Sequence, residues 1–356
     1  MRKLIILFFL GSLLMGGRFV SAEQAYSTAD TGAKPFRVSP DFKRKFALGF
    51  TPIPKQPINE KAWFGLFELL KQNSEFVLHH IHFDWKEFSK SPDVKSAKEW
   101  NSMVFVTEMS KRYGLNVFFV LDPLAPNREK LDPKIPKKWK KNFGDQNIRQ
   151  TFKNVAFRIA RDYKPRYIAL GSEMNTYFRR YPEDVNRFIT LCAETIALIK
   201  SISPETFVTV TFQYELMTGK VDGKTDWLLM NAIVNQMDLL SITTYPSIYF
   251  VNPEAILADY YSQLKQYTSK PVIVAESGWP TAGKSEFHGS SASQKEFVER
   301  FVILTRDLDL RLWIWWFFHD WAGGGYPEFF KSMGLFTSSG NPKPAFQSWQ
   351  KIYRKW

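Results

Sequence analysis

The sequence contains a single cysteine, Cys192, in 356 residues. One thiol excludes a disulfide within the chain. Cys192 lies on the apolar stripe of a predicted helix, which favours a core position over a role as nucleophile. Glycine motifs that bind phosphate are also missing, since the chain has neither GxGxxG nor a P-loop. Their absence argues against an open sheet that binds nucleotides.

Long apolar runs are equally scarce, and the one at the start of the chain spans only residues 4–15. Arg2 and Lys3 precede it, and small residues lead to a cleavage site after Ala22, which is the pattern of a secretory signal peptide. The run is too short for a comfortable transmembrane helix. We therefore predict that residues 1–22 are a signal peptide, that the protein is secreted or periplasmic, and that it has no stable membrane insertion. An uncleaved membrane anchor is the alternative interpretation.

Acidic residues are outnumbered by basic ones, 35 to 48, which gives a formal charge of +13. Residues 1–22 contain three basic residues and no acid, so their removal leaves +10. A basic surface suits an anionic polysaccharide, an anionic membrane face or nucleic acid, but it is equally typical of a solvated surface. The sequence shows no nucleic-acid motif, so we expect no nucleic-acid partner. The lysine-rich segment 134–141 fits either a solvated loop or a substrate contact.

Eight short apolar runs recur along the rest of the chain, with helical patterns between them. They cover residues 46–50, 76–83, 117–121, 167–170, 207–212, 239–244, 272–275 and 312–318. Near-continuous apolar runs are typical of parallel strands that are buried on both faces. The alternation predicts an α/β fold, and eight units favour a single (β/α)8 TIM barrel over a doubly wound open sheet. We expect residues 23–44 to form a poorly ordered lead-in and residues 45–356 to form the barrel domain.

Two glutamates follow apolar runs directly. Glu173 comes after the fourth run and Glu276 after the seventh. The carboxyl ends of barrel strands meet at one rim, so we expect these side chains to converge from opposite sides of its mouth. Glycoside hydrolysis needs such a pair, at about 5–5.5 Å apart for retention of configuration and about 6.5–9.5 Å for inversion. The alternative is that one or both glutamates form structural ion pairs.

Segment 274–283 around Glu276, with the sequence VAESGWPTAG, resembles the nucleophile segment of family 17 β-1,3-glucanases. The whole barrel is similar to clan A glycoside hydrolases, with a looser similarity to family 53 endo-β-1,4-galactanases. The resemblance implies a glycosidase that hydrolyses O-glycosyl bonds of a polysaccharide or oligosaccharide by double displacement. It also implies that Glu173 is the general acid/base, that Glu276 is the nucleophile, and that Tyr245, after the sixth run, donates a hydrogen bond to the nucleophile.

The likeness to clan A is incomplete beside the acid/base. Members of this clan usually carry an asparagine directly before the acid/base, where it binds the sugar 2-hydroxyl, whereas this chain has Ser172. Asn175 follows two residues after Glu173 and is the candidate for a replacement amide. We therefore predict that both Ser172 and Asn175 bind substrate.

Further substrate contacts are expected from side chains near the strand ends. Flat aromatic rings pack against the apolar C–H faces of sugars, and a few polar groups orient a bound ligand. The candidates are Trp279, Trp315, Trp316 and Trp321, together with His82, Asp84, Trp85 and Asp122 at the ends of the second and third runs. Structural hydrogen bonding is the alternative role for the polar candidates.

Two other functions fit the same residues. A catalytically silent carbohydrate-binding barrel would keep the cleft without the chemistry, and Ser172 and the basic charge leave that interpretation open. The His80 and His82 pair also matches the way some barrel amidohydrolases begin a zinc site, which suggests a metal-dependent hydrolase. Of the other histidines, His288 and His319 lie on later segments, but neither sits in a strong ligand pattern. We expect no metal, no cofactor, a carbohydrate as the partner and a monomeric protein.

Overall fold

The computed structural model describes residues 43–94, 98–283 and 288–355. The predicted signal peptide and nearly all of the predicted lead-in lie outside these residues. Arg44, which the sequence assigned to the lead-in, is instead buried, and its guanidinium lies 2.6 Å from the carboxylate of Glu75. The packed part of the protein therefore includes Arg44.

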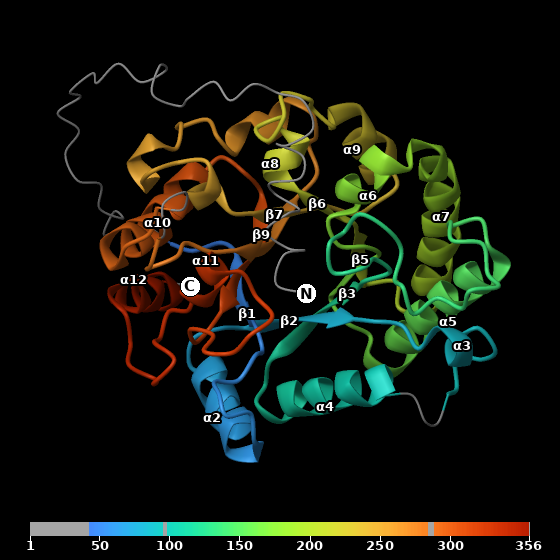
Figure 1. The fold of residues 1–356 in the computed structure, drawn as a ribbon, viewed down its shortest axis with the longest axis horizontal. Coiled ribbons are helices and arrows are strands. Elements are labelled where there is room, and N and C mark those ends of the chain that lie inside the picture. The colour runs from blue at the N-terminus through green and yellow to red at the C-terminus, as the bar shows by residue number, and fades with distance from the viewer. Residues whose placement is uncertain (1–42, 95–97, 284–287, 356) are drawn as a thin grey trace.

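Within the described residues, nine parallel strands form one sheet that curls into a nearly closed barrel (Figure 1). The strands are β1 (Ala47–Thr51), β2 (Phe76–Ile81), β3 (Asn116–Leu121), β4 (Tyr167–Ala169), β5 (Phe207–Thr209), β6 (Thr211–Gln213), β7 (Leu240–Thr244), β8 (Val272–Ser277) and β9 (Leu310–Phe317). Their order is β5-β4-β3-β2-β1-β9-β8-β7-β6. Only Val210 separates β5 from β6, so this stretch of chain pairs with β4 through its first half and with β7 through its second. The eight predicted runs thus occupy eight barrel positions, which confirms the (β/α)8 barrel and shows that the open sheet is wrong.

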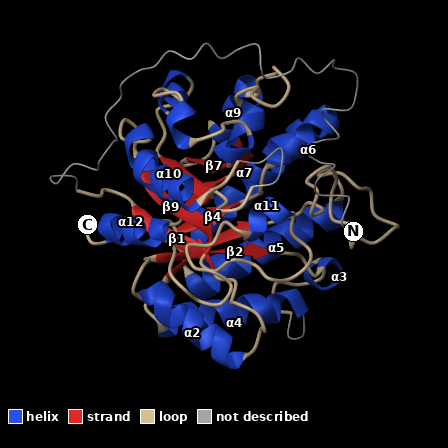
Figure 2. Ribbon diagram, turned by 60° about the vertical axis from the view of Figure 1, so that its left-hand side comes forward, coloured by secondary structure: helices blue, strands red, loops and turns tan. Residues whose placement is uncertain are grey.

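Helices surround the sheet, as the ribbon in Figure 2 shows. The α-helices of the described residues are α2 (Glu60–Lys71), α3 (Trp85–Phe88), α4 (Lys98–Arg112), α5 (Gln146–Tyr163), α6 (Met174–Arg180), α7 (Val185–Ile202), α8 (Tyr214–Met217), α9 (Trp227–Val234), α10 (Ser291–Leu304), α11 (Glu328–Lys331) and α12 (Pro344–Tyr353). The 3-10 helices are η2 (Pro182–Asp184), η3 (Pro246–Ile248), η4 (Pro253–Ala255) and η5 (Ser262–Gln266). The last three form the connection from β7 to β8 in place of an α-helix. None of the described helices is both long and apolar enough to cross a membrane.

Helix α5 shows how the sequence pattern produces these elements. The side chain of Asp145 caps its first turn by accepting hydrogen bonds from the backbone N–H groups of Asn147 and Ile148. Ile148, Phe152 and Ile159 keep helical spacing, and all three are buried. The apolar face packs in the layer of side chains that lies between the helices and the sheet.

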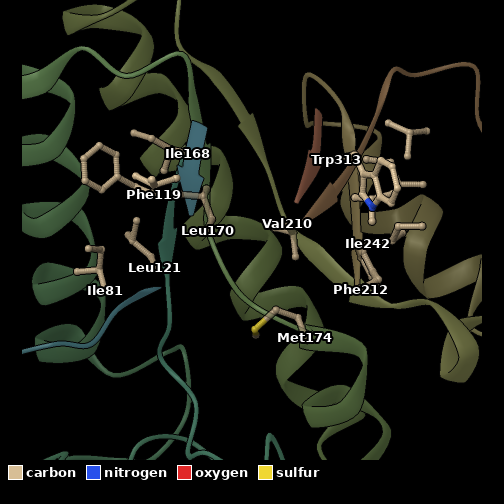
Figure 3. Packing of buried hydrophobic residues seen from close by; sticks show 14 of the residues in the cluster. Ile81, Phe119, Leu121, Ile168, Leu170, Met174, Val210, Phe212, Ile242 and Trp313 are labelled. Carbon is tan, nitrogen blue, oxygen red and sulfur yellow. The ribbon is translucent and has the colours of Figure 1, made fainter. Parts of the chain in front are cut away.

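Apolar side chains pack in two layers, one inside the barrel and one between the sheet and the helices. On β3, Phe118 and Val120 belong to the inner cluster, together with Leu78 of β2. Phe119 and Leu121 belong to the outer cluster, part of which Figure 3 shows at close range. This alternation follows from the two-residue period of a strand. Because side chains fill the barrel interior, a substrate site has to lie at a rim.

Strand β9 departs from simple alternation. Strict alternation along a strand would place Trp313, Trp315 and Phe317 on one face. The two tryptophans are fully buried in the outer layer, whereas Phe317 packs in a separate cluster. The register of β1 against β9 shifts between Phe50 and Thr51, and such an irregularity turns the side chains that follow it.

Candidate active site

The carboxyl ends of the strands surround a cavity of about 1210 Å³. Glu173 and Glu276 both line this cavity, as do Tyr245 and Asp122. Parallel barrels carry their active sites at this rim, because the loops that follow the strands converge there. The structure therefore brings together the two carboxylates that the sequence singled out.

Glu173 lies between the end of β4 and the start of α6. Its backbone has φ = 50° in the left-handed region, which is unusual for a residue other than glycine. Such a conformation costs on the order of 1–3 kcal/mol and is typical of functional sites. The Oε1 atom accepts a hydrogen bond of 2.6 Å from the hydroxyl of Thr243, and Oε2 lies 3.6 Å from Nε of Arg128. The strained turn thus holds a carboxyl group between one hydroxyl and one cation.

Glu276 lies on β8, directly after a shift in the register between β7 and β8, and its side chain is 9% exposed. The hydroxyl of Tyr245 donates a hydrogen bond of 3.0 Å to Oε2, which is the contact that the sequence predicted. Nε2 of His80 lies 2.9 Å from Oε1. Each carboxylate oxygen therefore has its own partner, and the group is fixed in orientation.

His80 belongs to a chain of contacts that links the two glutamates. Its Nδ1 atom lies 3.2 Å from Oδ2 of Asp122, and Nη1 of Arg128 donates a hydrogen bond of 2.5 Å to the same oxygen. Arg128 in turn lies next to Glu173. Positive and negative groups alternate along the series Glu276, His80, Asp122, Arg128 and Glu173, so each charge has a neighbour of opposite sign.

The pKa values of these groups differ because their partners differ. Burial lowers the pKa of His80, but its hydrogen bonds to Asp122 and Glu276 outweigh burial and raise the pKa to about 9. Burial raises the pKa of Asp122, but the charge of Arg128 and the contact with His80 hold that pKa well below its usual range. Burial also raises the pKa of Glu173, which Arg128 partly offsets and the charge of Glu276 increases further. At neutral pH, His80 is therefore a cation and Asp122 an anion, and Glu173 keeps its proton to higher pH than an ordinary glutamate does.

The sequence matches no protein-family model and no curated protein. Solved structures do match. An exo-β-1,4-mannosidase from Opitutaceae bacterium strain TAV5 has a TM-score of 0.67 at 15% identity, over 90% of this chain and 61% of that one. A family 5 glycoside hydrolase from Streptomyces cattleya, in complex with Manβ1-4GlcNAc, has a TM-score of 0.65 at 14% identity, over 88% and 81%. A family 39 glycoside hydrolase from Bacteroides cellulosilyticus WH2 has 0.59 at 15% identity, over 86% and 63%.

The shared feature is the barrel fold. The chain spans less than two thirds of the length of the mannosidase and of the family 39 enzyme. These structural neighbours are clan A glycoside hydrolases, as the sequence resemblance implied for the fold. The closer likeness to families 17 and 53 stays a prediction.

Among the predicted substrate contacts, His82, Asp122 and Trp316 line the cavity. The indole ring of Trp316 is half-buried and lies edge-on to the imidazole of His80, with 6.3 Å between the ring centroids. Its indole nitrogen has no hydrogen-bond partner among the described residues. Trp316 is therefore the tryptophan placed to contact a sugar beside the two carboxylates.

The predicted replacement amide is not available to a substrate. Asn175 is fully buried, and its side-chain nitrogen donates to the carbonyl of Gln213 and to the carboxylate of Asp226, both at 3.1 Å. Its side-chain oxygen accepts a hydrogen bond of 2.9 Å from the backbone of Gln213. Ser172 is also buried, at 1% exposed, and is not among the cavity-lining residues. Both predictions are corrected, because these side chains lie behind the cavity wall.

Three of the predicted aromatic contacts are core residues. Trp279 and Trp315 are 0% exposed and Trp85 is 2% exposed. The indole nitrogen of Trp315 donates to the carbonyl of Met333 at 2.7 Å, and that of Trp85 donates to Asp132 at 2.9 Å. Side chains this deeply packed do not reach a ligand in the cavity, so these predictions are wrong.

Two further candidates lie outside the cavity wall. A carboxylate oxygen of Asp84 accepts a hydrogen bond of 3.2 Å from the backbone of Trp100, which fixes the start of α4. Trp321 packs edge-on against Tyr326, with 5.7 Å between the ring centroids, and of these two only Tyr326 lines the cavity. Neither Asp84 nor Trp321 lines the cavity, so the structure does not place either of them against a ligand there.

Sequence reasoning missed three members of the site. His80 was considered only as a metal ligand, but both of its ring nitrogens face carboxylates. Across the described residues, no group of three or more His, Cys, Asp or Glu side chains is placed to hold a metal ion. Arg128 and Thr243 were not considered at all. The alternation of His80 on β2 and His82 just after it pointed to the cavity, whereas nothing in the local sequence marks Arg128 as the partner of two carboxylates.

Proposed function

We propose that this protein is a retaining glycoside hydrolase that cleaves β-glycosidic bonds of an oligosaccharide or polysaccharide, with Glu173 as general acid/base and Glu276 as nucleophile. One observation carries the proposal. Two carboxyl groups from β4 and β8 share one cavity but have different surroundings: Tyr245 and His80 each contact one oxygen of Glu276, whereas burial raises the pKa of Glu173. Acid and nucleophile roles require that difference.

In the first half of the reaction, protonated Glu173 donates its proton to the glycosidic oxygen. A carboxylate oxygen of Glu276 attacks the anomeric carbon, the bond from that carbon to the leaving oxygen breaks, and an ester bond to Glu276 forms. In the second half, Glu173 as carboxylate takes a proton from water while the water oxygen attacks the anomeric carbon. The ester breaks, Glu276 leaves as a carboxylate, and Glu173 is again protonated.

The neighbouring side chains support both halves. Tyr245 and His80 hold one oxygen of Glu276 each, which orients the group toward the anomeric carbon and keeps a positive charge beside the carboxylate. Arg128 stabilises Glu173 as an anion after it has given up its proton, since its guanidinium lies 3.6 Å from the carboxylate. Thr243 donates to the other oxygen of Glu173 and so limits its rotation.

The cavity favours an extended substrate. Its volume of about 1210 Å³ exceeds the range of about 300–1,000 Å³ that is typical of sites for single small molecules. Half-buried Trp316 supplies a flat surface beside the carboxylates for the C–H face of a sugar ring. Both features support an oligosaccharide or polysaccharide as substrate. Export through residues 1–22 is part of the proposal, and the N-terminal sequence of the mature protein would check it.

A trapping experiment tests the proposal. The protein is first screened against a panel of neutral and charged polysaccharides to find the sugar it releases, and is then incubated with the matching 2-deoxy-2-fluoroglycoside. We expect one fluoroglycosyl group per chain, attached to the peptide that contains Glu276, in mass spectra. Glu129→Gln serves as a matched control and should be labelled as the wild-type protein is. Glu129 lines the same cavity, but its carboxylate pairs with Arg180 at 2.7 Å. Labelling elsewhere, or a product of inverted configuration, would overturn the assignment.

A further inference from the structure

The cavity extends beyond the two carboxylates, outward from the barrel between α2 and α4. These helices follow β1 and β2, so their first turns lie at the same rim as the carboxyl ends of those strands. Both ribbon views place them side by side, and the rings of Trp63 and Phe105 meet edge-on across them with 5.2 Å between their centroids (Figures 1 and 2). We call this extension the side arm and define it by the cavity-lining residues Thr51, Trp63, His79, Ser102 and Val106.

Strand geometry connects the side arm to the catalytic centre. His79 and His80 are neighbours on β2, and successive side chains of a strand point to opposite faces. His80 points to Glu276 at the mouth of the barrel, so His79 points outward to the helices. The single cavity is lined by both histidines, which makes the side arm continuous with the site of bond cleavage.

The side arm presents polar groups that the protein leaves without partners. Thr51 is 8% exposed, and its buried hydroxyl forms no hydrogen bond with any described residue. The ring nitrogens of His79 and the indole nitrogen of Trp63 likewise have no hydrogen-bond partner among the described residues. The hydroxyl of Thr51 is the buried one of these groups, whereas His79 and Trp63 are partly exposed, so all three polar groups beside this aromatic ring are available to a ligand.

The chemistry of these groups suits a sugar without charge. Burial, and then the nearby charges of His80 and His82, lower the pKa of His79 to about 3, so its imidazole is neutral at physiological pH. A neutral imidazole donates one hydrogen bond and accepts another, as a hydroxyl group does, and the indole of Trp63 adds a donor and a flat face. The five residues of the side arm carry no formal charge at that pH.

The wider cavity is not basic either, although the protein is. Four lysine or arginine residues and six aspartate or glutamate residues line it. One of the four, Arg128, is already paired with Asp122 and Glu173. With protonated His80, five cations face six carboxyl groups, one of which has a raised pKa, so the charges of the cavity nearly balance and the excess positive charge of the chain lies elsewhere.

We infer that the side arm is a second sugar-binding subsite, which holds an uncharged pyranose unit next to the bond that is cleaved. The inference rests on the proposed function and adds the substrate class to it, a neutral glycan of at least two units. The aromatic face of Trp63 packs against the ring of that unit. The hydroxyl of Thr51 and the imidazole of His79 bind its hydroxyl groups.

Filling the side arm tests the inference. Ser102 is an exposed residue of α4 that lines the side arm, so Ser102→Trp places a bulky side chain there without disturbing the core. Asn101→Trp is the matched control, because Asn101 is the neighbouring exposed residue on the same helix and does not line the cavity. The substrates are neutral β-linked gluco-, manno- and galacto-oligosaccharides of two to five units, and the aryl monoglycoside of the sugar that is released.

We expect Ser102→Trp to lower kcat/KM for the best oligosaccharide at least tenfold, mainly through KM, and to change kcat/KM for the aryl monoglycoside less than twofold. Asn101→Trp should leave both unchanged. Trp63→Ala is a second route to the same result, with thermal unfolding followed for every variant. Equal losses on both substrates, or no loss on either, would overturn the inference.

A binding measurement separates this inference from the proposed function. Calorimetric titration of the Glu173→Gln protein with the neutral oligosaccharides, and with oligouronides of the same length, measures affinity without hydrolysis. We expect Ser102→Trp, added to Glu173→Gln, to weaken binding of the neutral series at least tenfold. If the wild-type protein hydrolyses nothing and this loss is still seen, the proposed function fails and the subsite stands. Two results would overturn the subsite and leave the proposed function supported. In the first, hydrolysis depends on both glutamates but Ser102→Trp does not change binding. In the second, oligouronides bind more tightly than the neutral oligosaccharides.

Discussion

The two carboxylates of the cavity come from walls of the barrel that hold them in different ways. Glu173 sits on a left-handed turn at the start of a helix, and its neighbours are one hydroxyl and one cation that is shared with Asp122. Glu276 sits within strand β8, beside a shift in its register with β7, and each of its oxygens has a separate partner, one of them cationic. The comparison shows how one cavity keeps one carboxyl group able to exchange a proton and the other fixed in orientation.

Removing each carboxylate in turn is the strongest test of the different roles proposed for Glu173 and Glu276. We expect Glu276→Gly and Glu173→Gly each to lower kcat/KM by roughly 10⁴-fold or more, because reacting groups that act as a unit cannot replace each other. Azide added with an activated β-glycoside should restore turnover in both variants but give different products. These are an α-glycosyl azide from Glu276→Gly and a β-glycosyl azide from Glu173→Gly, distinguished by proton NMR. Products of the opposite configuration would show that the roles are reversed.

The cation beside Glu276 is the next test. We expect His80→Asn to lower kcat/KM by about 100-fold, because it removes a charged hydrogen bond worth roughly 1.5–3 kcal/mol from the nucleophile and leaves Asp122 without one partner. Tyr245→Phe removes only the neutral donor, so its loss should be nearer tenfold. Steady-state kinetics on one aryl glycoside measure both. Equal losses in the two variants would mean that the charge of His80 has no special role.

The pKa of His80 also predicts how stability changes with pH. Its pKa in the folded protein, about 9, lies above the ordinary histidine value of 6.5. The interaction therefore stabilises the fold fully below pH 6.5, and this stabilisation is lost as the pH rises through 9. The loss amounts to at most on the order of 3 kcal/mol. Urea unfolding at both ends of this range should show that loss for the wild-type protein but not for His80→Asn.

A substitution of Arg128 tests the surroundings of Glu173, the carboxyl group on the other side of the cavity. Its positive charge lowers the pKa of Glu173, so Arg128→Gln should raise that pKa and shift the alkaline limb of the kcat/KM profile to higher pH. In the proposed mechanism the second half of the reaction needs Glu173 as a base paired with a cation, so this half should slow by roughly tenfold. The pH dependence of kcat/KM gives the first effect and pre-steady-state burst kinetics the second. An unshifted profile would show that Arg128 does not influence the acid/base.

The smallest expected effect concerns two tryptophans that the sequence could not tell apart. Trp316 lines the cavity and Trp321 does not. Trp316→Ala should raise KM for an oligosaccharide by about tenfold, in line with the loss of one aromatic contact, while Trp321→Ala should change KM less than threefold. A larger effect at Trp321 would indicate that the segment around Tyr326 moves when substrate binds.

Much of the fold could be predicted from the sequence because buried parallel strands have a strong local signature. Each of the eight apolar runs became part of the barrel, and the apolar spacing of Ile148 and Phe152 gave the face of α5. The division of the fifth run at Val210 has no such signature, because it depends on which neighbour each half meets. The register shift beside Phe50 is likewise a property of two strands together.

The site could be predicted only where a residue follows directly from its strand. Glu173 and Glu276 end apolar runs, and the barrel brings such positions together without further information. Arg128 reaches both Asp122 and Glu173 through a loop whose shape the sequence does not reveal. Asn175 shows that closeness along the chain can mislead, since its position two residues after Glu173 suggested a ligand contact. Helix geometry instead turned it toward Gln213 and Asp226.

The left-handed backbone conformation at Glu173 lowers the stability of the fold, whereas the proposed activity requires a glutamate at this position. Glycine adopts φ = 50° without steric penalty, and Glu173→Gly also removes a carboxyl group whose burial is unfavourable. The inactive protein should therefore melt at a higher temperature than the active one. Selection for stability alone would eliminate this glutamate, so its presence at such a position indicates that selection maintains an activity.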